Sequence, residues 1–371
     1  RISKIVNRDT TEEIQKFFHD VITESNLFNI SKQEPIIPKQ YNLHTVHLNL
    51  TNKCNLKCIY CYADERDKKE NRLDFKDYLT IINSINNLSK NVDIVLTGGE
   101  PLLVSFALDV AEYAKKKGNQ LHLLSNGILI SNENIKKITE LFDLVKISLD
   151  GGTSEIHDFH RGEGSFYKTI KAIDLLIQNK AKVQLSMTVT KKNIDDIEGM
   201  INKFGSLLSF APLFKAGRAK DNKQLSISGR EYYNALTSIK NVNPMSYLCS
   251  SLDRAKNQRI MKCAIGDAEI SISDTGDVYP CHLLHLPQFL AGNVKEKSLE
   301  AIYQNSDNLK SCRQLNVLNV KGCKKCDLRF ICGGACRARA FYEKKKINVS
   351  DDFCEYEKQA YINGLFDMHE F

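Results

Sequence analysis

The sequence predicts an α/β protein in which a partial (β/α)6 TIM-like barrel is followed by a small Cys-rich domain. Three observations support this prediction: short apolar runs alternate with amphipathic stretches, polar motifs follow several of those runs, and nine of the twelve cysteines lie beyond residue 212. The chain has 371 residues, which is more than one ordinary domain of roughly 100–200 residues needs. We therefore expect a barrel-sized unit and a smaller second unit.

The barrel is expected between residues 44 and 215, where the βαβ rhythm repeats six times. Its strands are expected at 46–50, 93–96, 121–124, 144–149, 183–189 and 207–210. Its helices are expected at 75–88, 105–116, 132–141, 166–178 and 194–204. Six units favour an incomplete barrel over a closed eightfold one, and such barrels gather their active groups at the C-terminal ends of the strands.

Three further segments flank the barrel. Residues 1–43 contain an amphipathic stretch at 11–28, which predicts a helix, and a proline-bounded connector at 35–38. Residues 216–262 form a bridging segment, and residues 263–371 form the Cys-rich domain.

Composition narrows the class of protein. Hydrophobic residues make up 42% of the chain and charged residues 26%, as in soluble globular proteins rather than disordered chains. The formal charge of +7 is spread over many lysines and gives no support to nucleic acid as a partner. No apolar stretch reaches the roughly 18 residues of a membrane span, and the N-terminal residues lack an apolar signal core. We therefore expect a cytoplasmic protein with no membrane or nucleic-acid partner.

Twelve cysteines are the unusual feature of this composition. Because the cytosol keeps thiols reduced, metal ligation explains them better than disulfides do. Cys54, Cys58 and Cys61 have C-x3-C-x2-C spacing directly after the first expected strand. Structural zinc prefers four ligands, whereas a 4Fe-4S cluster held by three thiolates leaves one iron open to a substrate or cofactor. The alternative is a zinc knuckle that a distant residue completes.

This triplet, with Tyr60 before its last cysteine, resembles the signature of the radical S-adenosylmethionine superfamily. The resemblance implies that Cys54, Cys58 and Cys61 hold a catalytic 4Fe-4S cluster, whose open iron chelates the amino and carboxylate groups of S-adenosylmethionine. It also implies that an electron from the cluster cleaves this cofactor to methionine and a 5'-deoxyadenosyl radical. That radical abstracts a hydrogen atom from the substrate.

A glycine-containing motif follows the second expected strand and fits the same resemblance. Gly98 and Gly99 let the backbone approach a ligand closely, and the carboxylate of Glu100, before Pro101, attracts an ammonium group. The resemblance identifies that ammonium as the amino group of S-adenosylmethionine. A simple βα turn is the alternative.

Small polar side chains follow the third and fourth expected strands. Ser125, Asn126, Ser148 and Asp150 lie on the same rim and suit the hydroxyl groups of a ribose. By the resemblance, Ser148 and Arg161 help to hold the cofactor. Alternatively, Asp150 and Arg161 form an ordinary surface ion pair.

A second cysteine array lies beyond the barrel. Its order is C, G-x4-C, C-x2-C-x5-C-x3-C and C, in which the glycine is Gly276 and the cysteines are Cys263, Cys281, Cys323, Cys326, Cys332, Cys336 and Cys354. This order resembles the SPASM domain, which holds auxiliary clusters in many peptide- and protein-modifying radical enzymes. Two structural zinc sites are the alternative, because paired C-x2-C is also zinc chemistry.

The SPASM resemblance implies two auxiliary 4Fe-4S clusters. One would be held by Cys323, Cys326, Cys332 and Cys354, and the other by Cys263, Cys281 and Cys336. The second set is one ligand short, and Cys249 is the first candidate for the missing ligand, with Cys312 as the second. If neither cysteine binds, an open iron is left for a substrate thiolate.

The resemblance to SPASM-containing maturases implies an enzyme that modifies a ribosomally synthesised peptide, with a thioether or other side-chain cross-link as the expected product. Its partners would be the precursor peptide and a reductase, flavodoxin or ferredoxin that donates electrons. His282, directly after Cys281, is a candidate proton acceptor, with a purely structural role as the alternative. Anaerobic sulfatase maturases, which oxidise Cys or Ser, carry an Asp at this position, so His282 disfavours that second reading.

Other functions stay open at this point. A non-catalytic iron-sulfur electron-transfer protein needs the clusters but not the set of Glu100, Ser148, Asp150 and Arg161, and a small-molecule substrate is a further alternative. The stretch at 11–28 is similar to the last helix of a leader-peptide-binding domain, which makes residues 1–43 a candidate remnant of that domain. A simple packing helix is the other interpretation.

Overall fold

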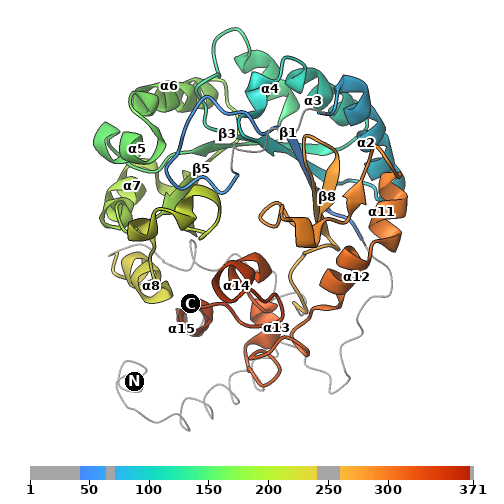
Figure 1. Cartoon of the computed structure of the whole chain (residues 1–371). Coiled ribbons are helices and arrows are strands. Elements are labelled where there is room, and N and C mark those ends of the chain that lie inside the picture. Colours follow the sequence, from blue (N-terminus) through green and yellow to red (C-terminus); the bar gives the residue numbers. More distant parts are fainter. Residues whose placement is uncertain (1–41, 64–71, 240–259, 368–371) are drawn as a thin grey trace, which may run out of the picture.

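The structure is a computed structural model that describes residues 42–63, 72–239 and 260–367. The helix expected at 11–28 and the candidate ligand Cys249 lie outside these residues. Within them, a sheet of nine strands curves around the centre of the molecule, and helices cover its outer face (Figure 1).

Six parallel strands form the barrel, as the βαβ pattern predicts. They are β1 (Thr45–Thr51), β2 (Asp93–Gly98), β3 (Gln120–Ser125), β4 (Leu144–Ser148), β5 (Val183–Val189) and β6 (Leu208–Pro212). They lie in the order β6-β5-β4-β3-β2-β1. The predicted fold class, a partial (β/α)6 TIM-like barrel with a Cys-rich C-terminal region, is confirmed.

The helices between these strands lie on the outside of the barrel (Figure 1). They are α2 (Phe75–Leu88), α3 (Ala107–Lys116), α4 (Ile135–Leu141), α5 (Ser154–Arg161), α6 (Ser165–Gln178) and α7 (Ile197–Phe204). Helix α2 begins at a capping box, in which the side chains of Asp74 and Asp77 each accept a hydrogen bond from the other's backbone N–H. Helix α5 was not among the predicted helices, because only two of its eight residues, Ile156 and Phe159, are apolar.

Alternate residues of β1 face opposite sides of the sheet, as in any strand. Val46, Leu48 and Leu50 are buried in the main hydrophobic core beneath the helices. His47 lies on the other face, which turns into the barrel. The outer face of the sheet is therefore apolar, and its inner face carries polar groups.

The C-terminal region continues the barrel sheet, which the sequence pattern did not predict. Strand β7 (Glu269–Ile272) pairs in parallel with β1, and β8 (Asp277–Tyr279) and β9 (Gly292–Asn293) follow in antiparallel pairing. These strands have four, three and two residues, too short to give a clear period in the sequence. As a result, β1 is paired on both edges.

The remaining described helices are α8 (Gly229–Thr237), α11 (Leu299–Asn305), α12 (Asp307–Gln314), α13 (Arg329–Cys332), α14 (Arg337–Lys344) and α15 (Cys354–Asp367). Short 3-10 turns occupy Pro101–Leu103, Ile194–Asp196, Gly205–Leu207, Gly217–Lys220, Lys223–Leu225 and Pro287–Phe289. Helices α13, α14 and α15 lie across the open side of the sheet (Figure 1). The Cys-rich region therefore closes the side that six barrel strands leave open.

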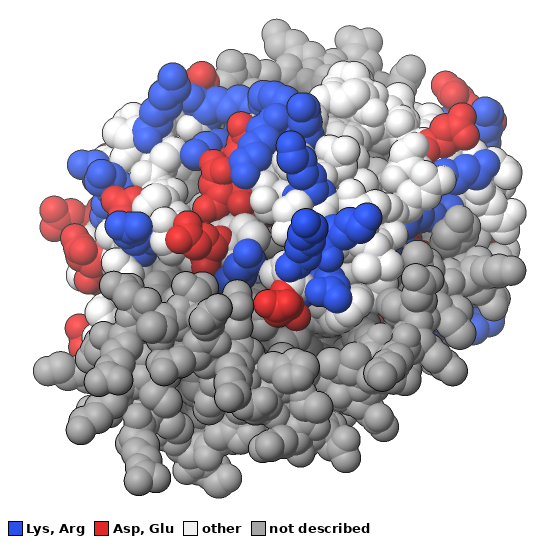
Figure 2. All heavy atoms as spheres, turned by 90° about the horizontal axis from the view of Figure 1, so that it is seen from below, with Lys and Arg blue, Asp and Glu red and all other residues white. Residues whose placement is uncertain are grey.

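Two surface properties bear on the expected partners. In the described parts of the chain, no helix is both long and apolar enough to cross a membrane. On the face shown in Figure 2, Lys and Arg side chains lie beside Asp and Glu side chains.

Replacing Ile270 with Ala tests whether the C-terminal region and the barrel form one core. Ile270 lies on β7, pairs with Val46 of β1 and has no exposed surface, so Ile270→Ala should lower the free energy of unfolding by about 2–5 kcal/mol. Denaturant unfolding of the whole protein measures this change. The control Ile177→Ala removes a side chain that is 48% exposed and should change the free energy by less than about 0.5 kcal/mol. Equal effects of the two substitutions would contradict the shared core.

Candidate active site

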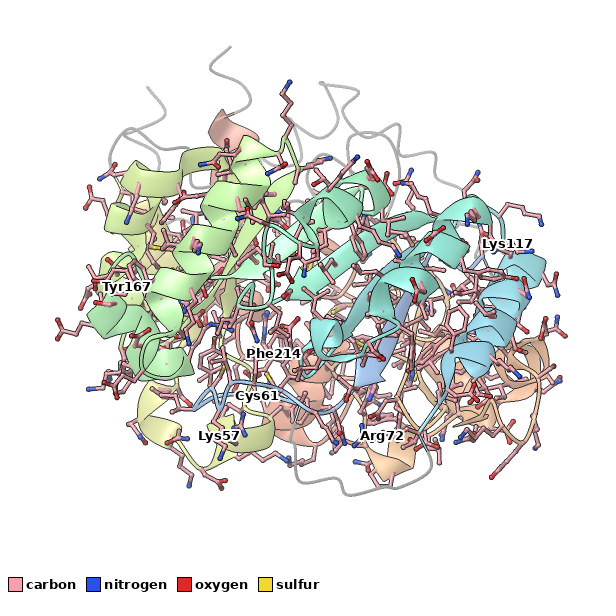
Figure 3. The ribbon with its side chains drawn as sticks, turned by 90° about the horizontal axis from the view of Figure 1, so that it is seen from above. Lys57, Cys61, Arg72, Lys117, Tyr167 and Phe214 are labelled. Carbon is pink, nitrogen blue, oxygen red and sulfur yellow. The ribbon has the colours of Figure 1, made fainter. Side chains whose placement is uncertain are left out.

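The three cysteines of the C-x3-C-x2-C motif lie on the loop that follows β1. Cys58 is buried, and Cys54 and Cys61 are partly exposed. Figure 3 shows Lys57 and Cys61 at one side of the barrel and Lys117, just after α3, toward the opposite side. The loop therefore lies at the C-terminal ends of the strands, where barrels of this kind carry their active groups.

The backbone of this loop is held by two other segments. The N–H of Ile59 donates to the carbonyl of His160 in α5 at 2.9 Å. Arg218 donates through its backbone N–H to Cys61 O at 2.9 Å and through Nε to Cys58 O at 2.8 Å. Because the loop is anchored at both positions, its thiols keep a fixed arrangement.

The surroundings of the three thiols fit a metal cluster. Burial raises the pKa of Cys54 to about 11 and also raises the pKa of Cys58 and of Cys61. Burial disfavours the thiolate form of these cysteines, and a bound metal would supply compensating positive charge. Hydrogen-bond donors already face two of the sulfurs: Leu56 N lies 3.4 Å from Cys54 Sγ, and Arg161 Nη1 lies 3.9 Å from Cys58 Sγ. Donors of this kind are typical of the environment of cluster sulfurs.

Gly98 and Gly99 pack directly against the start of the cysteine loop. Gly99 N donates to Thr51 O at 2.6 Å, and Glu100 N donates to Lys53 O at 2.8 Å. A Cβ atom on Gly98 would lie 2.2 Å from Thr51 O, and one on Gly99 would lie 2.1 Å from Lys53 O. Only glycine allows this approach, so both glycines are needed for the packing of this turn against the cysteine loop.

Glu100 is fully buried and connects the motifs that follow β2 and β3. Its carboxylate accepts hydrogen bonds from Ser125 Oγ and Asn126 N, both at 2.9 Å, and from Leu102 N at 3.2 Å. Asn126 Nδ2 in turn donates to Asn55 Oδ1 at 2.7 Å, inside the cysteine loop. These predicted site residues therefore lie together, and Pro101 begins the short helical turn after Glu100.

Asp150, Arg161 and Tyr60 form a buried group beside Cys58. The carboxylate of Asp150 accepts hydrogen bonds from Tyr60 Oη and Arg161 Nε, and Arg161 Nη2 donates to Tyr60 Oη at 2.7 Å. The side chain of Asp150 is 0% exposed and that of Arg161 is 10% exposed, so the pair is not an ordinary surface ion pair. Ser148 lies half-buried at the end of β4, opposite Ser186 of β5.

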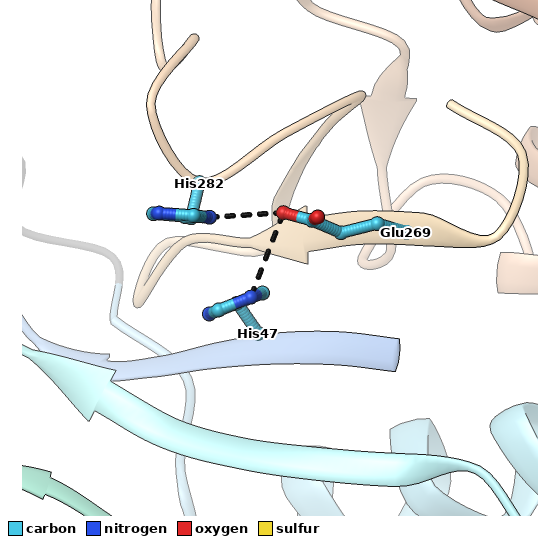
Figure 4. Close-up of side chains that lie close together, drawn as sticks. All are labelled: His47, Glu269 and His282. Carbon is cyan, nitrogen blue, oxygen red and sulfur yellow. Dashed lines mark hydrogen bonds and ion pairs between the residues drawn. The ribbon is translucent and has the colours of Figure 1, made fainter. Parts of the chain in front are cut away.

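His282 lies in a group of three polar side chains inside the barrel (Figure 4). Its Nδ1 is 2.9 Å from Glu269 Oε1, and His47 Nε2 is 3.5 Å from the same oxygen. The two imidazole rings are stacked, with centroids 4.3 Å apart. Burial alone would raise the pKa of Glu269. The hydrogen bond and electrostatic interaction with His282 outweigh burial and lower this pKa to about 2. An ionised Glu269 accepts the Nδ1 proton of His282, which fixes the tautomer of that ring.

Sequence analysis did not identify His47 and Glu269 as members of the site. Each lies on a strand facing the inside of the barrel, but a single His or Glu on a strand is not specific by itself. The only usable signal was that β1 precedes the cysteine loop directly. Glu269 reaches the site because β7 pairs with β1, and no sequence pattern predicted this pairing.

A cavity of about 650 Å³ separates the barrel motifs from the C-terminal region. Gly98 and Gly99 line one side, His282 and Tyr279 line the other, and Tyr62 of the cysteine loop also contributes. A volume of this size suits a bound small molecule or part of a larger one. The cavity joins the candidate cofactor residues to the candidate proton acceptor.

The C-terminal cysteines lie in two groups. Cys263, Cys281 and Cys336 share one apolar cluster, which also contains the buried Cys312. Electrostatic coupling links Cys323 with Cys326 and Cys354, and Cys332 with Cys354. This grouping matches the two sets that the SPASM resemblance implies. The assignment of each cysteine as a ligand stays a prediction.

A partial barrel with a three-thiol loop at its strand ends, a buried carboxylate beside it and a second thiol-rich region is an arrangement suited to holding metal clusters. Comparisons with known families agree: the chain matches the radical SAM superfamily over residues 48–204 and the SPASM iron-sulfur cluster-binding domain over residues 263–327. The chain belongs to the radical SAM superfamily and carries a SPASM domain. The resemblance found in the sequence is confirmed, and it implies iron-sulfur clusters and S-adenosylmethionine as cofactors.

Individual relatives differ in what they act on. The chain is 26% identical over 336 residues to the AdoMet-dependent heme synthase of Methanosarcina barkeri, covering 83% of this chain and 95% of the synthase. It is 25% identical over 325 residues to the mycofactocin maturase MftC of Mycobacterium tuberculosis, covering 82% of this chain and 81% of the maturase. The solved structure of native anSMEcpe with bound AdoMet and Cp18Cys peptide has a TM-score of 0.71 at 18% identity, covering 88% of this chain and 99% of that one. That likeness supports the fold.

Replacing Gly99 with Ala should disrupt the cofactor side of the site. The added Cβ must push Lys53 and the cysteine loop away from β2, so binding of S-adenosylmethionine should weaken at least about tenfold. Equilibrium dialysis of the reconstituted protein measures the affinity. The matched control is Gly199→Ala in α7, where the nearest contact of the new Cβ is a carboxylate oxygen at 3.3 Å. Unchanged binding in Gly99→Ala would contradict the proposed close packing.

The buried His47 should make stability depend on pH. Burial, and then the charge of His282, lowers the pKa of His47 to about 3 from its ordinary value of 6.5. Below pH 6.5 the unfolded chain takes up a proton that the folded chain does not, so stability falls as the pH falls from 6.5 toward 3. Anaerobic unfolding between about pH 7.5 and pH 5 should give a smaller slope for His47→Gln than for the wild type. An equal slope would contradict the neutral, buried imidazole.

Proposed function

We propose that this protein is a radical S-adenosylmethionine enzyme whose catalytic 4Fe-4S cluster is held by Cys54, Cys58 and Cys61. When bound, the cluster and cofactor supply the electron and the 5'-deoxyadenosyl radical that takes a hydrogen atom from the substrate. The single observation that carries this proposal is the direct packing of the Gly98–Gly99 turn against the loop of the three cysteines. The cofactor thereby has a binding surface immediately beside the cluster.

The chain's own residues would hold the cofactor in place. Glu100 offers a buried carboxylate that Ser125 and Asn126 keep in position, which suits the amino group of S-adenosylmethionine. Ser148 and Asp150 follow β4 on the same rim. Arg161, which donates a hydrogen bond to Tyr60 of the cysteine loop, would also help to hold the cofactor.

We propose that His282 handles a proton of the substrate. The ionised Glu269 accepts a hydrogen bond from Nδ1, so Nε2 is the ring atom left to exchange a proton with the substrate. The ring lines the same cavity as Gly98 and Gly99, so a substrate there has access to both sides. Glu269 therefore acts as a positioning residue for His282.

A peptide is the proposed substrate, with a thioether or other side-chain cross-link as the proposed product. A peptide maturase, MftC, is among the relatives, and the matching anSMEcpe structure contains a bound peptide. The charge of the cavity agrees with this choice. Its described lining includes Lys220 and the acidic residues Asp221, Asp274 and Asp277, of which Asp274 is paired with Arg72. This lining carries no excess of positive charge that would attract a ligand with several carboxylates.

Modification of a tetrapyrrole is the second candidate, because a heme synthase is also among the relatives and aligns with 95% of its own length. Heme carries two propionate groups, and the lining just described offers one lysine to them. We therefore rank this candidate below the peptide. His282 still disfavours the sulfatase-type maturase, which carries an Asp at this position. A non-catalytic electron-transfer protein would not need the hydrogen-bonded arrangement around Glu100.

We propose two auxiliary 4Fe-4S clusters in the C-terminal region, one on Cys323, Cys326, Cys332 and Cys354 and the other on Cys263, Cys281 and Cys336. Cys312 packs in the same apolar cluster as the second set. That position supports Cys312 as its fourth ligand, beside the candidate Cys249. Electrons from a reductase, flavodoxin or ferredoxin would enter through these clusters.

Anaerobic reconstitution followed by incubation with dithionite and S-adenosylmethionine tests the reaction class. The protein should bind about twelve iron atoms per chain and form 5'-deoxyadenosine, and Cys54→Ala should abolish this product because the catalytic cluster cannot assemble. Liquid chromatography measures the product. Lys57→Ala, an exposed residue of the same loop, is the matched control and should keep the activity. Bound zinc without 5'-deoxyadenosine would contradict the proposal and favour the structural alternative.

Competition between two ligands distinguishes the substrate classes. Candidate precursor peptides encoded near the gene, and hemin as a representative tetrapyrrole, are each titrated into the reconstituted protein with S-adenosylmethionine present. We expect a peptide to bind and to increase formation of 5'-deoxyadenosine, and we expect hemin to do neither. Stimulation by hemin or a related porphyrin alone would make the second candidate the correct one.

A further inference from the structure

We propose that Arg161 sets the reduction potential of the catalytic cluster, and that Asp150 offsets part of its effect. This inference rests on the proposed assignment of Cys54, Cys58 and Cys61 as cluster ligands, and it is independent of the substrate. It assigns Arg161 a role that is separate from holding S-adenosylmethionine. The role is electrostatic and acts before the cofactor binds.

The geometry places the guanidinium of Arg161 between a cluster ligand and a carboxylate. Its Nη1 donates to Cys58 Sγ at 3.9 Å, its Nη2 donates to Tyr60 Oη at 2.7 Å, and its Nε donates to Asp150. The guanidinium carbon also lies 5.8 Å from the centre of the Tyr60 ring. Three separate contacts therefore fix the position of the positive charge next to Cys58.

Asp150 is held as firmly as Arg161. Besides the donors of Tyr60 and Arg161, its carboxylate accepts from the backbone N–H of Thr188 at 2.8 Å. Burial alone would raise the pKa of Asp150, but Arg161, Tyr60 and Thr188 together lower it. The site therefore contains one fixed positive and one fixed negative charge, with the positive one in contact with the cluster ligand.

Burial makes these charges effective. The Asp150 side chain is 0% exposed and the Arg161 side chain is 10% exposed, so water screens them weakly. Arginine stays protonated in proteins, so its charge persists across the working pH range.

The sign of the effect follows from electron transfer to the cluster. One-electron reduction adds one negative charge to the cluster and its thiolates, with no bond made or broken. A positive charge and a donor beside a ligand sulfur favour the reduced form and raise the potential, and a negative charge lowers it. Removing Arg161 and removing Asp150 should therefore shift the potential in opposite directions. A purely structural role of this pair predicts no such opposition.

The test is an EPR-monitored redox titration of the reconstituted full-length protein without S-adenosylmethionine. The signal of the catalytic cluster is identified as the component that is absent in Cys54→Ala. In Arg161→Met, the ratio of reduced to oxidised cluster at the wild-type midpoint should fall about tenfold, which corresponds to about 59 mV for a one-electron couple. In Asp150→Asn the ratio should rise instead.

Two further variants separate charge from packing. Arg161→Lys keeps the charge and should lie between the wild type and Arg161→Met. Arg72→Met breaks another Arg–Asp pair. Among the described residues, the guanidinium of Arg72 donates to Asp274, Thr51 and Asn52 and to no cysteine, so this variant should leave the ratio at the wild-type value. Circular dichroism and iron content confirm that each variant is folded and loaded.

The outcomes decide the inference as follows. Opposite shifts in Arg161→Met and Asp150→Asn support it, and unchanged potentials or shifts of the same sign in loaded protein overturn it. If Arg161→Met fails to assemble the cluster, the potentials of Asp150→Asn and Arg161→Lys test the inference instead. A potential of Asp150→Asn at or below the wild-type value would then overturn the inference. A wild-type protein without any Cys54-dependent signal would refute the cluster assignment itself, and the inference with it.

Discussion

The parallel pairing of β1 with β2 on one edge and with β7 on the other is the constraint on which the site depends. The first pairing brings the Gly98–Gly99 turn against the cysteine loop, with backbone groups in contact at 2.6 Å and 2.8 Å. The second pairing brings Glu269, and with it His282 and Cys281, to the opposite side of the same strand. One strand thus fixes the distance between the cofactor side and the C-terminal side of the cavity.

The buried carboxylates at the strand ends accept hydrogen bonds from neighbouring protein groups. Glu100 receives three donors, and Asp150 receives donors from a tyrosine, an arginine and a backbone N–H. Burying unpaired carboxylates would cost several kcal/mol each, so these networks hold the loops in a single arrangement. A rigid rim of this kind keeps a reactive species in one place, because its neighbours cannot reorganise around it.

Much of the fold and of the cofactor side could be predicted because both depend on local sequence. Six strands have apolar runs of sufficient length, and the cysteine and glycine motifs have specific spacings. The rest depends on contacts between distant segments. Strand β7 is too short to show a period, the partnership of His282 with Glu269 requires β7 to lie beside β1, and α5 has too few apolar residues to be recognised as a helix. Spacing showed that Asp150 and Arg161 follow one another, but only the packing shows that the pair is buried beside Cys58.

The two walls of the cavity come from different parts of the chain. The wall with Gly98 and Gly99 belongs to the barrel and is tied to the cysteine loop, so a change there disturbs the cofactor site. The wall with His282 and Tyr279 comes from the loop and strands after β7 and makes no contact of that kind with the glycines. A substitution on the second wall is therefore expected to leave the packing of the two glycines on the cysteine loop in place. In this chain that wall carries His282, held by the carboxylate of Glu269, together with Asp274 and Asp277.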